Sequence, residues 1–158
     1  MQSKSCLTGR LIAVCVLVLA SVAAWAQGMI VNAGDRSLGI YATNGAGPNA
    51  ALRLHNRCGP QTPDCLWSMQ NGFLLNAKTG LVVLARGLQP GAPLVMADQR
   101  ECGPNNALCL WIYRDGMFIS WSEPRLAIVA WGGPRFGSEL RLNANCNPSI
   151  PDCAWVPP

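Results

Sequence analysis

Six cysteines of this 158-residue chain form three pairs with one shared spacing, Cys-x6-Cys. Thiols at a fixed spacing can form disulfides or bind zinc, but the cysteines of a zinc-ligand pair are normally separated by only about two to four residues. A local disulfide in each pair is therefore the prediction, with zinc as the alternative. The predicted disulfides are Cys58–Cys65, Cys102–Cys109 and Cys146–Cys153.

Few residues are suited to catalysis. The chain has a single histidine, His55, so a nucleophile–base–acid triad has few candidates and a multi-histidine metal site is excluded. Asp98 and Glu101 are the closest acidic pair, and their place in the repeat described below predicts a loop. No glycine-rich phosphate loop with a following lysine occurs. The sequence predicts neither an enzyme, a bound metal nor a cofactor.

The first 26 residues have the pattern of a secretory signal peptide. Lys4 and Arg10 precede the apolar run 11–20, and Ala24-Trp25-Ala26 supplies small residues at a cleavage site before Gln27. We therefore expect a secreted or periplasmic mature protein spanning residues 27–158. An uncleaved anchor and a lipoprotein modified at Cys15 are the alternatives.

The composition of the mature chain excludes several partners. It carries 10 Lys and Arg against 8 Asp and Glu, a net charge of +2, with no cluster of basic residues. Nucleic-acid binding is therefore not expected. No apolar run after the leader is long enough to span a bilayer, so no membrane span is expected in the mature chain.

The cysteines belong to a repeat of 44 residues. Trp67, Trp111 and Trp155 recur at the same interval as the cysteines. We expect three units, 28–71, 72–115 and 116–158, aligned without a gap. That alignment matches Leu38 with Val82 and Leu126, Ile40 with Leu84 and Ile128, and Leu52 with Met96 and Leu140.

Each unit contains short β-like runs separated by Gly, Pro and Asn, without a long amphipathic helical stretch. Three copies are too few for a propeller, which needs about four or more blades. Three four-stranded units can instead close around a pseudo-threefold axis and share one core. The predicted fold class is therefore all-β, a β-trefoil with one disulfide in each repeat.

The repeat resembles the ricin-type lectin domain, a β-trefoil with a Gln-x-Trp signature in each unit. Here the signature reads Cys65-Leu66-Trp67, Cys109-Leu110-Trp111 and Cys153-Ala154-Trp155. The tryptophans are retained, which predicts core packing, and cysteine replaces glutamine in every unit. A disulfide in place of the glutamine would tether the turn covalently.

The resemblance implies sugar binding where the family's contact residues are retained. Its sugar-binding aspartate aligns with Gly39, Val83 and Ala127, so it is missing throughout. The stacking aromatic aligns near His55, Gln99 and Asn143, and the amide before the signature aligns with Asp64, Leu108 and Asp152. The family's galactose-type site is therefore not expected.

Aromatic residues that break the repeat indicate a different site. Trp121, Trp131 and Phe136 have no aromatic counterpart in the other units. Trp131 and Phe136 bracket a turn-rich loop, expected on the surface beside the pocket of the third unit, with Arg135 as a nearby donor. The alternative is that Trp121 and Trp131 fill gaps in an asymmetric core. The predicted carbohydrate-binding residues are Trp131, Phe136, Asn143 and Asp152, with His55 and Asp64 as secondary candidates.

Two functions follow from these patterns. The first is a secreted carbohydrate-binding module whose partners are glycans or glycoconjugates. The alternative is a non-catalytic protein-interaction module, such as an inhibitor or a toxin-accessory subunit, because the family's aspartate is missing.

Overall fold

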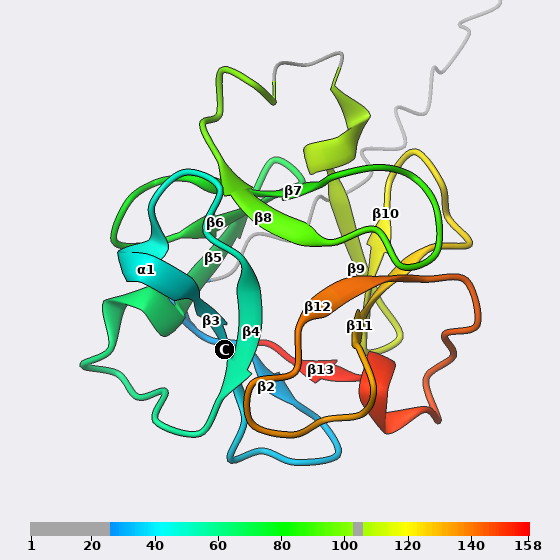
Figure 1. The fold of residues 1–158 in the computed structure, drawn as a ribbon, viewed down its shortest axis with the longest axis horizontal. Coiled ribbons are helices and arrows are strands. Elements are labelled where there is room, and N and C mark those ends of the chain that lie inside the picture. The colour runs from blue at the N-terminus through cyan, green and yellow to red at the C-terminus, as the bar shows by residue number, and fades with distance from the viewer. Residues whose placement is uncertain (1–25, 103–105) are drawn as a thin grey trace, which may run out of the picture.

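The computed structural model describes residues 26–102 and 106–158. Residues 1–25 of the expected signal peptide lie outside the described residues. Three β-hairpins surround the centre of the view in Figure 1, and short strands form the layer behind them. The hairpins are β3 (Gly39–Ala42) with β4 (Leu52–His55), β7 (Val82–Ala85) with β8 (Leu94–Ala97), and β11 (Ala127–Ala130) with β12 (Leu140–Asn143).

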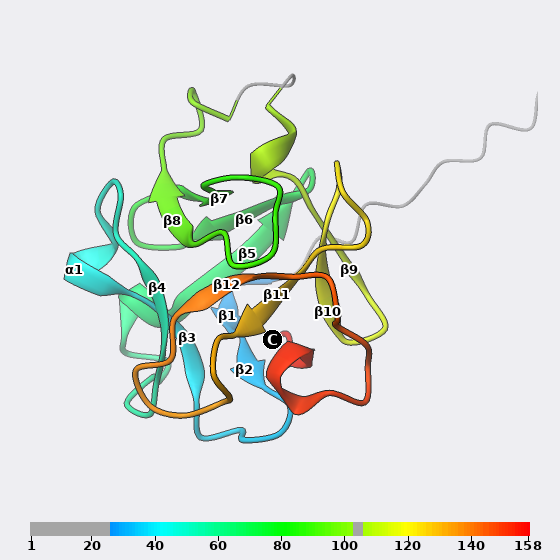
Figure 2. The same cartoon turned by 45° about the vertical axis from the view of Figure 1, so that its right-hand side comes forward.

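The remaining strands join the hairpins into three antiparallel sheets, ordered β1-β5-β6-β7-β8, β12-β11-β10-β9 and β13-β2-β3-β4. These strands are β1 (Gly28–Met29), β2 (Val31–Asn32), β5 (Leu66–Gln70), β6 (Phe73–Asn76), β9 (Trp111–Arg114), β10 (Met117–Ser120) and β13 (Trp155–Val156). A one-turn element, α1 (Thr43–Ala46), and three 3₁₀ turns complete the fold: η1 (Pro63–Cys65), η2 (Ala107–Cys109) and η3 (Pro151–Cys153). Because β13 pairs with β2, the last strand closes the ring beside the first unit (Figure 1). Figure 2 shows the three hairpins in a turned view. The predicted β-trefoil is confirmed.

The three hairpins are locked to one another around the axis by backbone hydrogen bonds. One residue in each hairpin loop has a positive φ and donates its N–H to the last strand of the next hairpin. These bonds run from Asn49 to the Met96 carbonyl at 2.7 Å, from Gly91 to Leu142 at 2.7 Å and from Gly137 to Leu54 at 2.9 Å. Glycine adopts this conformation without strain and asparagine tolerates it, which explains the residue types found there.

The repeated tryptophans form the core, as the sequence predicts. Trp67, Trp111 and Trp155 are at most 1% exposed. Their indole N–H groups donate to the carbonyl oxygens of Ile40, Val83 and Ile128 at 2.9, 3.0 and 3.0 Å. Each ring therefore contributes apolar area while its one polar atom is satisfied.

The expectation of a gapless repeat is wrong within the second unit. Trp111 bonds to Val83, although the interval of 44 would place Leu84 there. The segment before β7 (77–81) and the loop 86–93 are each one residue shorter than in the other units, and the segment 98–101 is two residues longer. The changes cancel before Cys102, so the cysteine spacing conceals them. By the strand pairing, the equivalent residues at the start of the second strand of each hairpin are Leu52, Leu94 and Leu140. Those at the start of the first strand are Gly39, Val82 and Ala127.

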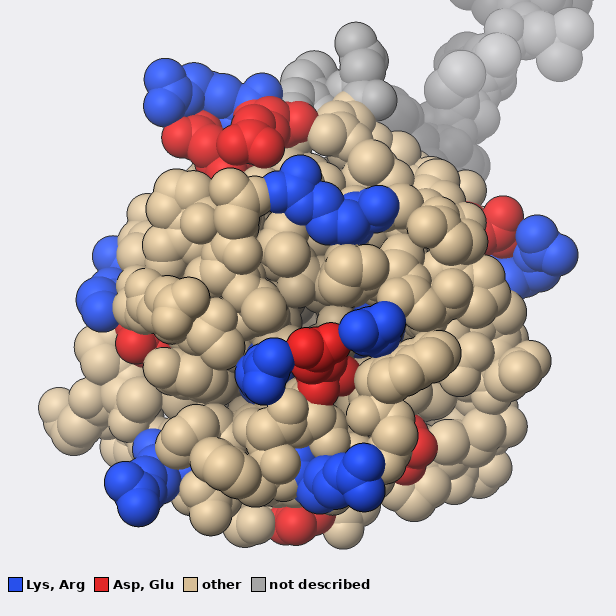
Figure 3. Space-filling view, in the orientation of Figure 1, with Lys and Arg blue, Asp and Glu red and all other residues tan. Residues whose placement is uncertain are grey.

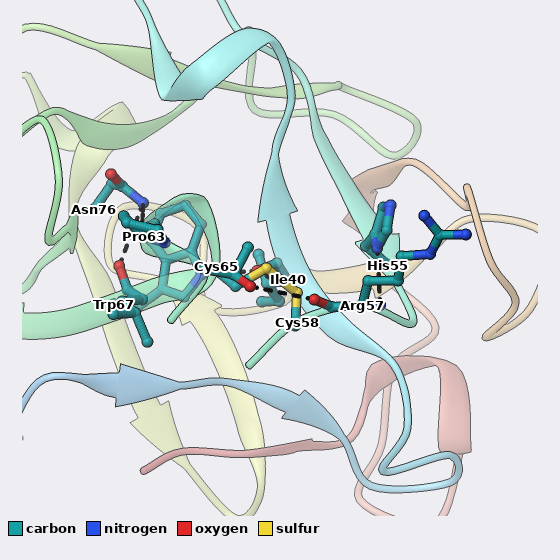
Figure 4. Close-up of a disulfide and its surroundings, with 10 residues drawn as sticks. Ile40, His55, Arg57, Cys58, Pro63, Cys65, Trp67 and Asn76 are labelled. Atoms are coloured by element: carbon teal, nitrogen blue, oxygen red, sulfur yellow. Dashed lines mark hydrogen bonds between the residues drawn. A yellow bond between two sulfur atoms is a disulfide. The ribbon is translucent and has the colours of Figure 1, made fainter. Parts of the chain in front are cut away.

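All three predicted disulfides are present, with Cα–Cα distances of 5.5 Å for Cys58–Cys65 and 5.7 Å for the other two. Each ties a 3₁₀ turn to the segment that follows a hairpin. In the first unit the turn is also held by a buried side chain, Asn76, whose Nδ2 donates to the Pro63 carbonyl at 3.2 Å (Figure 4).

Asn32 holds the 3₁₀ turn of the third unit in the same way. Its Nδ2 donates to the carbonyl oxygens of Pro151 and Ala154 at 2.7 and 3.2 Å, and its Oδ1 accepts the N–H groups of Gly34 and Asp35. Asn32 and Asn76 are fully buried. Their spacing of 44 residues was available in the sequence, but the third position is Ser120, so the pattern is incomplete.

Candidate functional site

An aromatic cluster joins the third unit to the first. The Phe136 ring lies 5.0 Å from the His55 imidazole, nearly perpendicular to it at 74°, and the His55 ring lies 5.0 Å from the ring of Tyr41. The contact arises because the axial hydrogen bond from Gly137 to Leu54 places the preceding residue beside the end of β4. Phe136 is 62% exposed, so this face of the cluster is available to a ligand.

His55 is fixed by a local hydrogen bond as well as by the rings. Its Nδ1 accepts the backbone N–H of Arg57 at 2.9 Å (Figure 4), which caps the turn after β4. His55, a secondary candidate on the sequence, and Phe136, a primary one, lie together in the structure. Tyr41 is not among the site residues predicted from the sequence, and its equivalents Leu84 and Val129 are aliphatic once the strands are aligned by their pairing.

A charged triad lies beside the aromatic cluster. Glu139 Oε1 accepts from Arg53 at 2.8 Å, and its Oε2 accepts from Arg141 at 2.7 Å. Hydrogen bonding from Arg141 lowers the pKa of Glu139, and the charge of Arg53 adds to the effect. The carboxylate therefore stays ionised and holds both guanidinium groups in place. Figure 3 shows acidic surface flanked by basic surface near the centre of this face.

Trp131 continues the surface on the other side of the triad. The Arg141 guanidinium carbon lies 5.5 Å from the centre of the indole, within the range of a cation–π contact. The ring is 44% exposed, and its neighbour from the second unit is Gly91. We call the continuous surface formed by Phe136, His55, Arg53, Glu139, Arg141 and Trp131 the axial surface.

The structure does not bring the other predicted site residues to the axial surface. Asn143 pairs with Ala127, at the opposite end of the β11–β12 hairpin from the loop that carries Phe136. It lies three positions along β12 from Leu140 at the loop end, which corresponds to about 10 Å. Its Oδ1 accepts the N–H of Asn145 in a local turn.

The two aspartates lie in 3₁₀ turns, Asp152 in η3 and Asp64 in η1, where Asp64 pairs with Lys78 at 3.0 Å. The loop 131–139 packs against the first unit, so its expected position beside the pocket of the third unit is wrong.

Trp121 is exposed, so it does not fill the core as one alternative held. Its exposed fraction is 60%, on the turn between β10 and β11.

A cleft of about 240 Å³ lies beside the loop 86–93 of the second unit. Glu123 and Arg125 pair there at 2.9 Å. The cleft is lined by Leu88, Pro90, Glu123, Arg125, Leu126 and Ala144.

Within residues 26–102 and 106–158, no group of three or more His, Cys, Asp or Glu side chains could hold a metal ion. The same part of the chain contains no helix long and apolar enough to cross a membrane.

Comparison with known proteins identifies the fold. No protein-family model matches the sequence, and a search of the curated proteins finds no match. Among solved structures, the C-half of an earthworm R-type lectin, in complex with GalNAc, aligns with a TM-score of 0.65 at 13% identity, over 82% of this chain and 95% of that chain. The agglutinin of Abrus precatorius aligns with a TM-score of 0.70 at 15% identity, over 89% of this chain and 50% of that chain.

A designed threefold-symmetric protein, ThreeFoil, aligns with a TM-score of 0.65 at 10% identity, over 82% of this chain and 95% of that chain. The fold is a ricin B-like β-trefoil.

The three positions that the resemblance aligns with a sugar-binding aspartate are closely packed in this chain. In the first unit that place is Gly39, and a Cβ there would lie 2.8 Å from the Cβ of Cys58 and 2.9 Å from its sulfur. A larger side chain, such as aspartate, therefore does not fit beside the disulfide.

The other two units are closed by apolar packing. In the second unit the strand pairing makes Val82 the equivalent of Gly39, so the expected alignment with Val83 is wrong. Val82 packs with Leu84, Ala97 and the Cys102–Cys109 disulfide. Ala127 packs in the same way with Val129 and Cys153. An aspartate at any of these three positions would therefore have to enter space that a disulfide or apolar side chains take up.

Proposed function

We propose that this protein is an exported, non-catalytic, lectin-like module that binds glycans at the axial surface. The observation that carries the proposal is the exposed ring of Phe136, held edge-on against His55 and adjacent to the Arg53–Glu139–Arg141 triad. Aromatic faces stack on the apolar faces of sugar rings, while charged groups nearby hydrogen-bond to hydroxyls. Trp131 provides a second ring for a longer ligand.

The location differs from the one expected from sequence. Asn143 and Asp152 are removed from the proposed site because they lie away from the aromatic rings. Tyr41, Arg53, Glu139 and Arg141 take their place. The site is thus composed of the third unit and the first, with Gly91 of the second unit beside Trp131.

The structural neighbours support the ligand class. The earthworm lectin is described in complex with GalNAc, and a homologue of type II ribosome-inactivating proteins from bitter gourd in complex with α-methyl-D-galactoside. Their identities to this chain are 13% and 15%, which supports the general class of ligand and leaves the sugar open.

Export is part of the proposal. Three disulfides are typical of secreted or periplasmic proteins. We propose that the leader 1–26 is removed before Gln27. N-terminal sequencing of the protein produced in its natural host tests this, and a mature chain that retains Arg10 would contradict it.

A glycan array probed with the purified mature protein tests the function. Binding is expected to decrease about tenfold in Phe136→Ala, because the aromatic contact and the apolar area that it buries together contribute about 1.4 kcal/mol. Trp121→Ala removes an equally exposed ring elsewhere and is expected to bind normally. Failure to bind any glycan would overturn the proposal.

A protein-binding module is the second candidate. It is favoured by the close packing where the resemblance would place a sugar-binding aspartate, and by exposed apolar side chains outside the axial surface, Trp121 and Leu88 at 60% and 40%. This candidate predicts capture of a defined protein that is lost in Trp121→Ala and retained after enzymatic removal of glycans from the partner. Capture abolished by deglycosylation would instead favour the glycan-binding proposal.

A further inference from the structure

The positive charge of this protein is concentrated on the face that contains the axial surface. Strands β4, β8 and β12 and the loops 43–51, 86–93 and 131–139 carry four arginines, Arg53, Arg86, Arg135 and Arg141, and one acid, Glu139. The rest of the described chain has slightly more acids than bases. Its bases are Arg36, Arg57, Lys78, Arg100, Arg114 and Arg125, and its acids are Asp35, Asp64, Asp98, Glu101, Asp115, Glu123 and Asp152.

The two arginines of the triad differ in the bonds they make. All three nitrogen atoms of Arg141 are engaged: Nε and one terminal nitrogen bond to Glu139, and the other donates to the Gly91 carbonyl at 3.3 Å. Arg53 uses one terminal nitrogen on Glu139. Since a guanidinium carries five N–H groups, Arg53 retains donors for a second anion.

Arg53 is also placed next to the stacking ring. It lies two residues before His55 on the same side of β4, and its side chain is 44% exposed. Glu139 fixes the guanidinium, which reduces the entropy lost when it binds an anion. One carboxylate between two guanidinium groups leaves the triad with a net positive charge.

We propose that the axial surface recognises an acidic glycan, with Arg53 binding its carboxylate or sulfate group while a sugar ring stacks on Phe136. The inference rests on the proposed function and specifies its ligand class. A guanidinium binds carboxylate and sulfate through the same paired N–H geometry, so the two kinds of acidic glycan must be separated by experiment.

The experiment uses an array in which each glycan core is present in neutral, sialylated and sulfated forms. The mature protein is expected to bind at least one acidic form about tenfold or more tightly than the neutral form of the same core, because hydrogen bonds to charged groups are the stronger class. Arg53→Gln is expected to abolish that preference. Arg114→Gln, an exposed arginine on β9, is the matched control and is expected to retain it.

The possible results separate this inference from the function on which it rests. Equal binding of neutral and acidic forms, with dependence on Phe136, would overturn the inference and leave glycan binding intact. No binding to any glycan would overturn both. Arg53-dependent binding to double-stranded DNA or to phosphatidylglycerol vesicles, without a preference among glycans, would also overturn it, because the surface would then attract polyanions in general.

Discussion

The ring of Phe136 lies 5.0 Å from that of His55, although 81 residues separate them in the sequence. The contact joins the loop of the third unit to the last strand position of the first hairpin. The equivalent loop positions, Pro48 and Pro90, lack an aromatic ring, so this junction between units differs from the other two. The three units thus share one backbone arrangement, and residues that differ between them form a distinctive surface where the third unit meets the first.

The buried asparagines are expected to stabilise the fold. Asn32→Ala or Asn76→Ala leaves buried carbonyl and N–H groups without partners, so each should lower the free energy of unfolding by about 1–3 kcal/mol. Denaturant unfolding followed by tryptophan fluorescence measures this. Asn145→Ala, at an exposed position, is the control and should change stability by less than about 0.5 kcal/mol. Equal effects at buried and exposed positions would contradict the assigned role.

Substitution of a core tryptophan should destabilise the fold far more than substitution of the exposed Trp121. Trp111→Phe removes the hydrogen bond to the Val83 carbonyl and leaves space in a packed core, so a loss of about 2–4 kcal/mol is expected. Trp121→Phe should be nearly neutral because its ring is exposed. Thermal unfolding of the two variants makes the comparison, and a larger loss for Trp121→Phe would argue against the described core.

Each disulfide should contribute measurably to stability. A ring of eight residues corresponds to about 2.5 kcal/mol by loop-closure entropy, which is an upper value. The double variant Cys58→Ser/Cys65→Ser should unfold at correspondingly lower denaturant concentration, with the other two disulfides intact by non-reducing peptide mapping. In the wild-type protein, peptide mapping that finds Cys58 joined to Cys102 would contradict the pairing.

The triad should make stability depend on pH in acid. The pKa of Glu139 is lowered in the folded protein, so its ionised form stabilises the fold above the pKa of the unfolded chain. That contribution is lost as pH falls through the lowered value. The melting temperature of wild type should therefore exceed that of Glu139→Gln near neutral pH, and the difference should shrink in acid. A difference that is independent of pH would contradict this account.

The sequence was sufficient for the fold because the cysteines and tryptophans keep one spacing through all three units. It did not reveal how the strands of the second unit align with those of the other units. The two extra residues of segment 98–101 compensate for the shortened segments before β7 and β8, so the spacing to Cys102 is unchanged. Comparing hydrophobic patterns within each hairpin could have detected the shift, since Val83 and Ala85 alternate inward as Ile40 and Ala42 do.

The site was only partly predictable. Phe136 and Trp131 stand out because they break the repeat, and both are exposed as a binding role requires. Their neighbours could not be inferred, since Arg53 and Tyr41 meet the third unit only through axial packing. Asn143 and Asp152 align with contact positions of the family, but in this fold they lie at the far end of the β11–β12 hairpin and in η3.

The most direct test of glycan binding at the axial surface is a titration of the best array ligand against wild type, Phe136→Ala and Trp121→Ala, with unfolding curves for all three. Phe136→Ala alone is expected to bind about tenfold more weakly, at unchanged stability. Full affinity in Phe136→Ala, or an equal loss in Trp121→Ala, would contradict it.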